Sequence, residues 1–115
     1  MSAPTPRSFT PLPSSVRFGQ VWESPDEAIG SMRYLVVSSE AYNSAFGDRR
    51  LIAVEVDSRA VYQGVYREPV VDAGTAHLDR LTWVTRRQLV ELVAELHPDR
   101  HDHVTTVIRQ LIGDL

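Results

Sequence analysis

A histidine and an aspartate lie two residues apart at His77 and Asp79, inside a strand candidate that covers residues 75–84. Because side chains at i and i+2 project to the same side of a strand, we expect this pair to act together. Histidine titrates near neutral pH and therefore suits proton transfer. The alternative is a polar face of an edge strand, on which Asp79 forms a structural ion pair with Arg80 or Arg67.

A second candidate base lies where an earlier strand candidate, residues 50–56, runs into Asp57 and Ser58. The carboxylate of Asp57 suits a general base if a neighbouring arginine holds it ionised. An Asp-Ser turn that ends the strand accounts for the same residues without chemistry. Arg33 lies where a loop enters the strand candidate at residues 32–38, a position that also suits an ordinary surface arginine.

The charge of the chain limits which partners are reasonable. All 12 basic residues are arginine, and the formal net charge is −3. Arginine forms planar, bidentate contacts with phosphate, although GC-rich coding explains the lack of lysine equally well. A negative domain does not suit general coating of nucleic acid, so any nucleic-acid site must be local.

Two further groups have a functional and a structural explanation. Trp22 and Trp83 are able to stack on bases, but aromatic residues in strands are more commonly core residues. Histidines and aspartates between residues 97 and 103 resemble a metal cluster, yet they straddle a helix break, so we expect a solvated helix start. We predict no metal and no cofactor.

Short strands are the elements that must position these residues. Alternating or β-branched apolar runs predict strands at residues 16–23, 32–38, 50–56, 61–66, 69–72 and 75–84. A short helix is predicted at residues 40–46, after the second strand. Two C-terminal helices are predicted, one over residues 86–96 with Thr85 as its N-cap and one from Pro98 to the end. This order predicts a mainly β fold, an antiparallel sheet with helices on one side.

Length and composition predict one domain in the cytoplasm. A chain of 115 residues supplies one modest core. Residues 1–15 hold four of the 7 prolines and predict a flexible tail ahead of a domain at residues 16–115. An apolar run of about 20 residues, a secretory h-region and cysteine are all lacking, so we expect a cytoplasmic protein with no membrane partner.

Several segments occur in an order that resembles one toxin family. Residues 19–22 are similar to an opening strand, Arg33 with residues 34–38 to an Arg-Pro-apolar strand, and Tyr42-Asn43 to an aromatic-Asn pair in the helical turn that follows. Residues 51–56 resemble the next strand, and residues 78–84 resemble a Leu-Asp-Gln-Ile-Arg-Thr-Ile segment. Across residues 17–115 the chain thus resembles the MazF/PemK toxins of the MazF/PemK/CcdB superfamily.

The resemblance implies a fold, partners and an activity. The fold is an SH3-like barrel of five to seven antiparallel strands, and the protein is a homodimer whose groove receives the disordered acidic segment of an antitoxin. The implied activity is that of an mRNA interferase, an endoribonuclease that cleaves single-stranded RNA without a metal. Such an enzyme needs a base for the ribose 2′-OH, a cation for the phosphorane and an acid for the leaving oxygen.

The resemblance also implies roles for individual residues. It assigns charge stabilisation or proton transfer to Arg33, and it matches His77 and Asp79 to an Arg-x-Asp of PemK-like members that supplies an acid and a base. The family has a second catalytic Thr or Ser at the end of the third strand. That Thr is missing here, so either Ser58, after a one-residue slip, or Asp57 takes its place.

Two alternatives to a ribonuclease stay open. Arg33-Tyr34 and residues 47–52 also resemble CcdB toxins, which share the fold and poison DNA gyrase without catalysis. CcdB chains end in an aromatic-Gly-Ile element that contacts gyrase, whereas this chain ends in Ile112-Gly113-Asp114-Leu115 and lacks the aromatic residue. The second alternative is a divergent, non-toxic relative that acts as a binding or regulatory protein.

Overall fold

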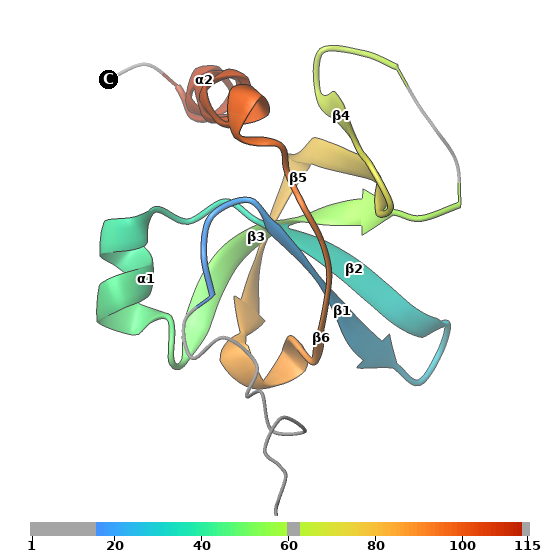
Figure 1. Ribbon diagram of the computed structural model, residues 1–115. Helices are drawn as coiled ribbons and strands as arrows, with labels where there is room; N and C mark the ends of the chain where they lie inside the picture. The colour runs from blue at the N-terminus through green and yellow to red at the C-terminus, as the bar shows by residue number, and fades with distance from the viewer. Residues whose placement is uncertain (1–15, 60–62, 114–115) are drawn as a thin grey trace, which may run out of the picture.

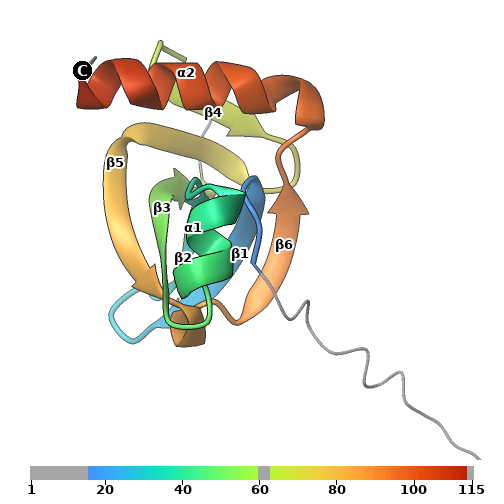
Figure 2. The ribbon, with the colours of Figure 1, turned by 90° about the vertical axis from the view of Figure 1, so that its left-hand side faces the viewer.

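Six antiparallel strands form one curled sheet in the computed structural model, which describes residues 16–59 and 63–113 (Figure 1). The strands are β1 (Gln20–Asp26), β2 (Gly30–Val36), β3 (Arg50–Asp57), β4 (Arg67–Val70), β5 (Gly74–Thr85) and β6 (Glu91–Glu95). Their order in the sheet is β4-β5-β3-β2-β1-β6. Figure 2 shows the sheet curling around into a half-barrel. The predicted mainly β fold is confirmed; the predicted tail lies outside the described residues.

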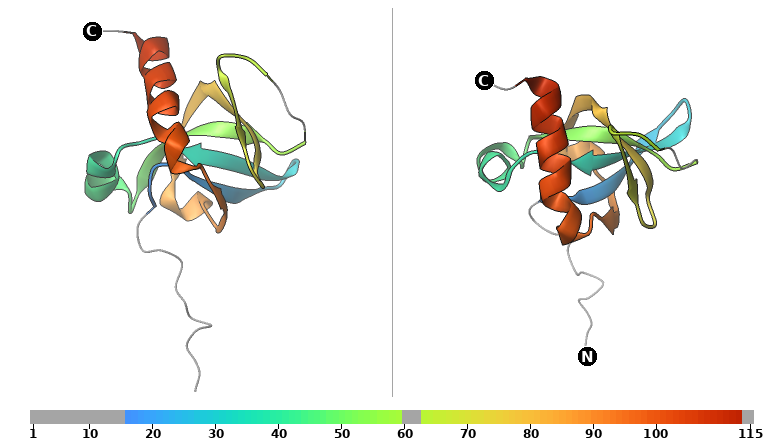
Figure 3. Two further views of the ribbon diagram at one scale, coloured as in Figure 1. Left: turned by 45° about the horizontal axis from the view of Figure 1, so that its top comes forward. Right: turned by 90° about the horizontal axis from the view of Figure 1, so that it is seen from above.

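Two helices accompany the sheet. α1 (Glu40–Phe46) begins at Ser39, whose hydroxyl accepts a hydrogen bond from the amide of Tyr42, and it covers the residues predicted from the sequence. α2 (His101–Ile112) crosses the sheet near the C-terminus (Figure 3). Neither of these helices has the length and apolar character needed to cross a membrane.

The sheet buries side chains on both faces. On one face α2 contributes Val104, Val107 and Ile108 to a core with Val54 and Val56 of β3. The other core gathers around Trp22, with its remaining members Val16, Val36, Leu51, Ala53, Val84 and Leu89. Because consecutive residues of β3 serve opposite cores, the strand reads as a nearly continuous apolar run.

The two tryptophans differ from each other. Trp22 is fully buried, as predicted, and its indole N–H donates to Gln20 Oε1 at 3.1 Å. The core prediction for Trp83 is wrong, because its side chain is 61% exposed. Trp83 lies opposite Ile52 in the register, and burial along this face of β3 decreases from Val54 through Ile52 to the exposed Arg50. The cover provided by α2 therefore ends before it reaches Trp83.

The predicted helix at residues 86–96 is wrong. Thr85 does act as an N-cap, but of a single 3₁₀ turn, η2 (Arg86–Gln88), after which the chain forms β6. β6 pairs with β1 from Gln20↔Glu95 to Glu23↔Glu91. The apolar spacing fits either structure, and the open edge of β1, which needs partners for its backbone groups, decides in favour of a strand. One C-terminal α-helix remains instead of two.

The first strand begins and ends later than predicted, at Gln20 and Asp26 instead of residues 16 and 23. Ser24-Pro25-Asp26 continue β1 and pair with β2 as far as Asp26↔Gly30. A proline is tolerated there because β6 pairs with β1 only up to Glu23, which leaves one side of β1 open at Pro25. The predicted strand at residues 61–66 lies partly outside the described residues, and its described part, residues 63–66, is a turn.

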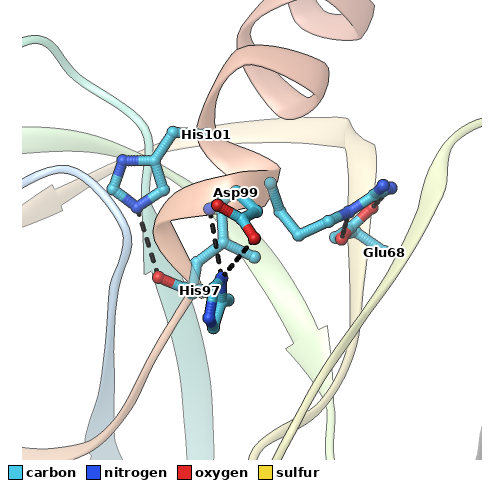
Figure 4. Close-up of polar contacts among 6 residues, drawn as sticks. Glu68, His97, Asp99 and His101 are labelled. Atoms are coloured by element: carbon cyan, nitrogen blue, oxygen red, sulfur yellow. Dashed lines mark hydrogen bonds and ion pairs between the residues drawn. The ribbon is translucent and has the colours of Figure 1, made fainter.

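An ion pair between a buried carboxylate and a half-exposed arginine attaches the start of α2 to the edge strand β4. Glu68 is 2% exposed, and its carboxylate accepts two hydrogen bonds from Arg100, at 2.7 and 2.9 Å (Figure 4). Arg100 belongs to the 3₁₀ turn η3 (Pro98–Arg100), which leads directly into α2. This bidentate contact ties the start of α2 to β4.

Candidate active site

A cavity of about 350 Å³ opens where β2, β3 and β5 meet. Four of the five site residues predicted from the sequence line it: Arg33, Asp57, Ser58 and His77. The other lining residues are Ile29, Ser31, Met32, Glu55, Val56, Arg59 and Arg80. Three arginines and two carboxylates therefore line this cavity, an excess of one positive charge in its lining on a chain of net negative charge.

Arg33 is held in the cavity by two separate contacts. It lies in β2 directly opposite Glu23 of β1, and its Nε donates to Glu23 Oε1 at 3.0 Å. Its Nη1 donates to the carbonyl oxygen of Ala73 at 2.8 Å. The side chain is 26% exposed. Arg33 is thus an oriented cation at the cavity wall.

The turn that carries Ala73 also sets the end of β3. Ala73 donates its amide to Val70, and Gly74 follows with a φ of +128°. A Cβ on Gly74 would lie 2.1 Å from the carbonyl oxygen of Asp57. Only glycine permits this approach and this φ, so the turn places Asp57 and Ser58 beside the cavity.

His77 is a buried imidazole in the cavity wall, 6% exposed. Burial lowers its pKa below the usual value for histidine, and the charges of Arg67 and Arg80 lower it further, against an opposing effect of Asp57 and Asp79. The ring is therefore neutral at pH 7, the form that accepts a proton.

Asp79 does not reach the cavity, although it was expected to act beside His77. Its carboxylate accepts a hydrogen bond from Nη1 of Arg67 at 2.8 Å. The cause is an irregular register, in which Val54 pairs with Leu81 but Val56 pairs with Ala76. Residues 77–80 of β5 therefore bulge, and the two-residue alternation that would align the two side chains is interrupted. The ion pair with Arg67 matches the structural alternative for Asp79.

Asp57 and Ser58 lie at the cavity but differ in their environment. Asp57 Oδ1 accepts a hydrogen bond from the amide of Arg59 at 2.8 Å, the geometry of a turn, and Arg59 Nε lies 3.7 Å from the same oxygen. This is the neighbouring arginine that an ionised Asp57 requires. Ser58 is exposed at the rim. Both the turn and the site interpretation fit these contacts.

Sequence reasoning missed Arg59 and Arg80 as cavity residues. Arg80 comes from the bulge of β5 and its Nη1 lies 3.5 Å from Glu55 Oε1. The net negative charge of the chain predicted that any nucleic-acid site must be local, but it did not indicate which arginines form that site. No pattern in the sequence predicts the bulge that turns Arg80 towards β3.

The histidines near the start of α2 make structural contacts. His97 Nδ1 accepts a hydrogen bond from the amide of Asp99 at 3.1 Å, and His101 Nε2 lies 3.2 Å from the carbonyl oxygen of Leu96 (Figure 4). Across residues 16–59 and 63–113, no three carboxylate or imidazole groups are arranged to hold a metal ion.

Comparison with known proteins gives a match in fold. No protein-family model and no curated protein sequence matches the chain. A mycobacterial endoribonuclease in complex with its cognate antitoxin is similar at a TM-score of 0.71 and 19% identity, covering 86% of this chain and 96% of that chain. MazF in a MazE-MazF complex from Deinococcus radiodurans reaches 0.65 at 23% identity, covering 88% and 98%. The Mycobacterium tuberculosis toxin MazF-mt6 reaches 0.64 at 10% identity, covering 84% and 99%. The chain has the fold of MazF toxins.

Proposed function

We propose that this protein is the toxin of a toxin–antitoxin pair and acts as an endoribonuclease that cleaves single-stranded messenger RNA without a metal ion. The observation that carries this proposal is the cavity that gathers a neutral, buried His77 and a doubly anchored Arg33. The MazF fold, seen in solved endoribonucleases, supports the same activity.

The proposed chemistry is attack of a ribose 2′-OH on its neighbouring phosphate. Neutral His77 accepts the 2′-OH proton while the new O2′–P bond forms, and Arg33 stabilises the charge on the phosphorane oxygens. The P–O5′ bond then breaks, and the imidazolium returns the proton to the leaving 5′ oxygen. The products are a 2′,3′-cyclic phosphate and a 5′-hydroxyl. Arg59 and Arg80 supply further contacts for phosphates of the strand.

Partners follow from the same proposal. Solved proteins with this fold include an endoribonuclease in complex with its cognate antitoxin and a MazE-MazF complex. For this chain we propose a homodimer and an antitoxin whose disordered acidic segment competes with RNA for the arginine-lined cavity, because carboxylates and phosphates bind guanidinium in the same way. Messenger RNA as the substrate fits a cytoplasmic protein.

Incubating the purified protein with a long messenger RNA in EDTA tests the proposal. We expect discrete fragments, with 5′ ends mapped by primer extension, and loss of cleavage in Arg33→Ala. Arg109→Ala is the matched control, because Arg109 is an exposed arginine on α2 and does not line the cavity. Absence of discrete fragments, or equal cleavage by Arg33→Ala and wild type, would overturn the proposal. Trapped complexes of gyrase with cleaved DNA in expressing cells would favour the CcdB-like alternative instead.

A further inference from the structure

The contact between Glu23 and Arg33 offsets part of the positive charge at the cavity. Glu23 lies in β1, opposite Arg33 in the register, and the side chains are 30% and 26% exposed. A carboxylate 3.0 Å from the guanidinium weakens its attraction for phosphate. An ion pair that remains partly exposed to solvent also contributes only modestly to the stability of a fold. Neither phosphate affinity nor stability explains why this carboxylate lies here.

The orientation of the Arg33 guanidinium explains the position of Glu23. Glu23 accepts a hydrogen bond from Nε of Arg33. The carbonyl oxygen of Ala73, which lies in the connection between β4 and β5, accepts a second hydrogen bond from Nη1. Two contacts on different atoms fix the plane of a rigid guanidinium. In the described part of the chain no hydrogen bond is formed by Nη2 of Arg33, and Arg33 lines the cavity, so this donor remains available for a ligand.

We propose that Glu23 is a positioning residue, which holds the guanidinium of Arg33 in the orientation that meets the phosphorane oxygens; this inference rests on the proposed ribonuclease function. Donors that are oriented before the reaction need no reorganisation in the transition state. An arginine without this contact must be brought into the productive orientation between the bound substrate and the transition state, which raises the barrier of the chemical step. The contribution of Glu23 therefore belongs in kcat.

Three variants separate orientation from charge. Glu23→Ala removes the acceptor, Glu23→Gln keeps an amide oxygen as acceptor but removes the charge, and Glu91→Ala is the matched control. Glu91 lies opposite Glu23 on β6, is exposed, and makes no contact with Arg33. The substrate is a short RNA with one cleavage site, and kcat and KM are measured separately for each variant.

We expect Glu23→Ala to lower kcat by about 10- to 100-fold with little change in KM, which is the scale of a small misplacement of a reacting group. Glu23→Gln should recover most of that loss, and Glu91→Ala should match wild type. Full activity in Glu23→Ala, or equal losses in Glu23→Ala and Glu23→Gln, would overturn the positioning role. The second outcome would mean that the charge of Glu23 matters and its orientation of Arg33 does not.

A second measurement does not depend on cleavage. The Arg33 Nε–H resonance in ¹⁵N NMR, assigned by its absence in Arg33→Lys, should be shifted and protected from exchange in wild type and Glu23→Gln. In Glu23→Ala it should move to the position of a free arginine side chain. An unchanged resonance in Glu23→Ala would overturn the inference. If wild type shows this pattern but cuts no RNA, the proposed function fails while the orientation of Arg33 by Glu23 is upheld.

Discussion

Replacing Gly74 with alanine should disturb both the fold and the candidate site. The new Cβ would lie 2.1 Å from the carbonyl oxygen of Asp57 and 2.8 Å from the Cα of Ser58. Ordinary contact for such atoms is near 3.4 Å, so the end of β3 and the turn before β5 must separate by more than an ångström. The φ of +128° adds backbone strain of about 1–3 kcal/mol for any residue with a Cβ.

The displacement and the strain have separate consequences. Strain together with the clash should lower the free energy of unfolding by about 2–4 kcal/mol. A shift of about 1 Å at Asp57 and at the carbonyl that anchors Arg33 should cost about 100-fold in cleavage rate, even in the folded fraction. Urea unfolding, followed by circular dichroism, and cleavage assays at a temperature where the variant is folded measure the two effects.

Gly113→Ala is the control that isolates the strain. Gly113 has a similar φ of +111°, lies after α2, and a Cβ there would meet nothing within 4 Å. We expect Gly113→Ala to lose some stability and no activity. The reasoning is refuted if Gly74→Ala loses no more stability than Gly113→Ala and cleaves RNA as fast as wild type.

Three other outcomes are expected. In the proposed mechanism the neutral form of His77 is the base, and its pKa is lowered, so the cleavage rate should fall only as the pH drops below about 6.5. Arg67→Gln should move this acid limb to higher pH, because it removes a cation that lowers the pKa of His77. An acid limb that stays in place in the pH–rate profile of Arg67→Gln contradicts this. Arg100→Gln should lower the melting temperature, because it leaves the buried carboxylate of Glu68 without its bidentate partner. Arg100→Lys should recover only part of this loss. Equal melting temperatures for wild type and Arg100→Gln would argue against a stabilising role of the contact between Arg100 and Glu68. Ser58→Ala should keep the cleavage rate within about threefold if His77 is the base, and a large loss in initial rate would return the role to the serine.

Local patterns predicted those elements whose ends are set by local chemistry. α1 was predicted with its observed bounds because Ser39 caps it and Gly47 ends it. β3 was predicted because its β-branched run serves two cores. The apolar spacing of α2 predicted the buried Val104, Val107 and Ile108, whereas Leu111 and Ile112 at the same spacing are exposed. In each case the residues that determine the structure are neighbours in sequence.

The remainder depends on residues that are distant in sequence. Residues 89–96 fit a helix or a strand equally well, and the open edge of β1, some 70 positions earlier, determines the outcome. The bulge that separates Asp79 from His77 arises where β5 must pair with both β3 and β4. For the same reason Arg33 was recognisable as a candidate, whereas its contacts with Glu23 and Ala73 were not.

The assembly of the cavity from three strands has a consequence for synthesis of the protein. Arg33 comes from β2, Asp57 from β3 and His77 from β5, and the bulge in β5 exists only once β3 is paired. A growing chain that has left the ribosome only as far as β4 therefore has no cavity. If the proposed ribonuclease activity depends on this cavity, the nascent polypeptide should not cleave the messenger RNA from which it is translated, because β5 is still missing.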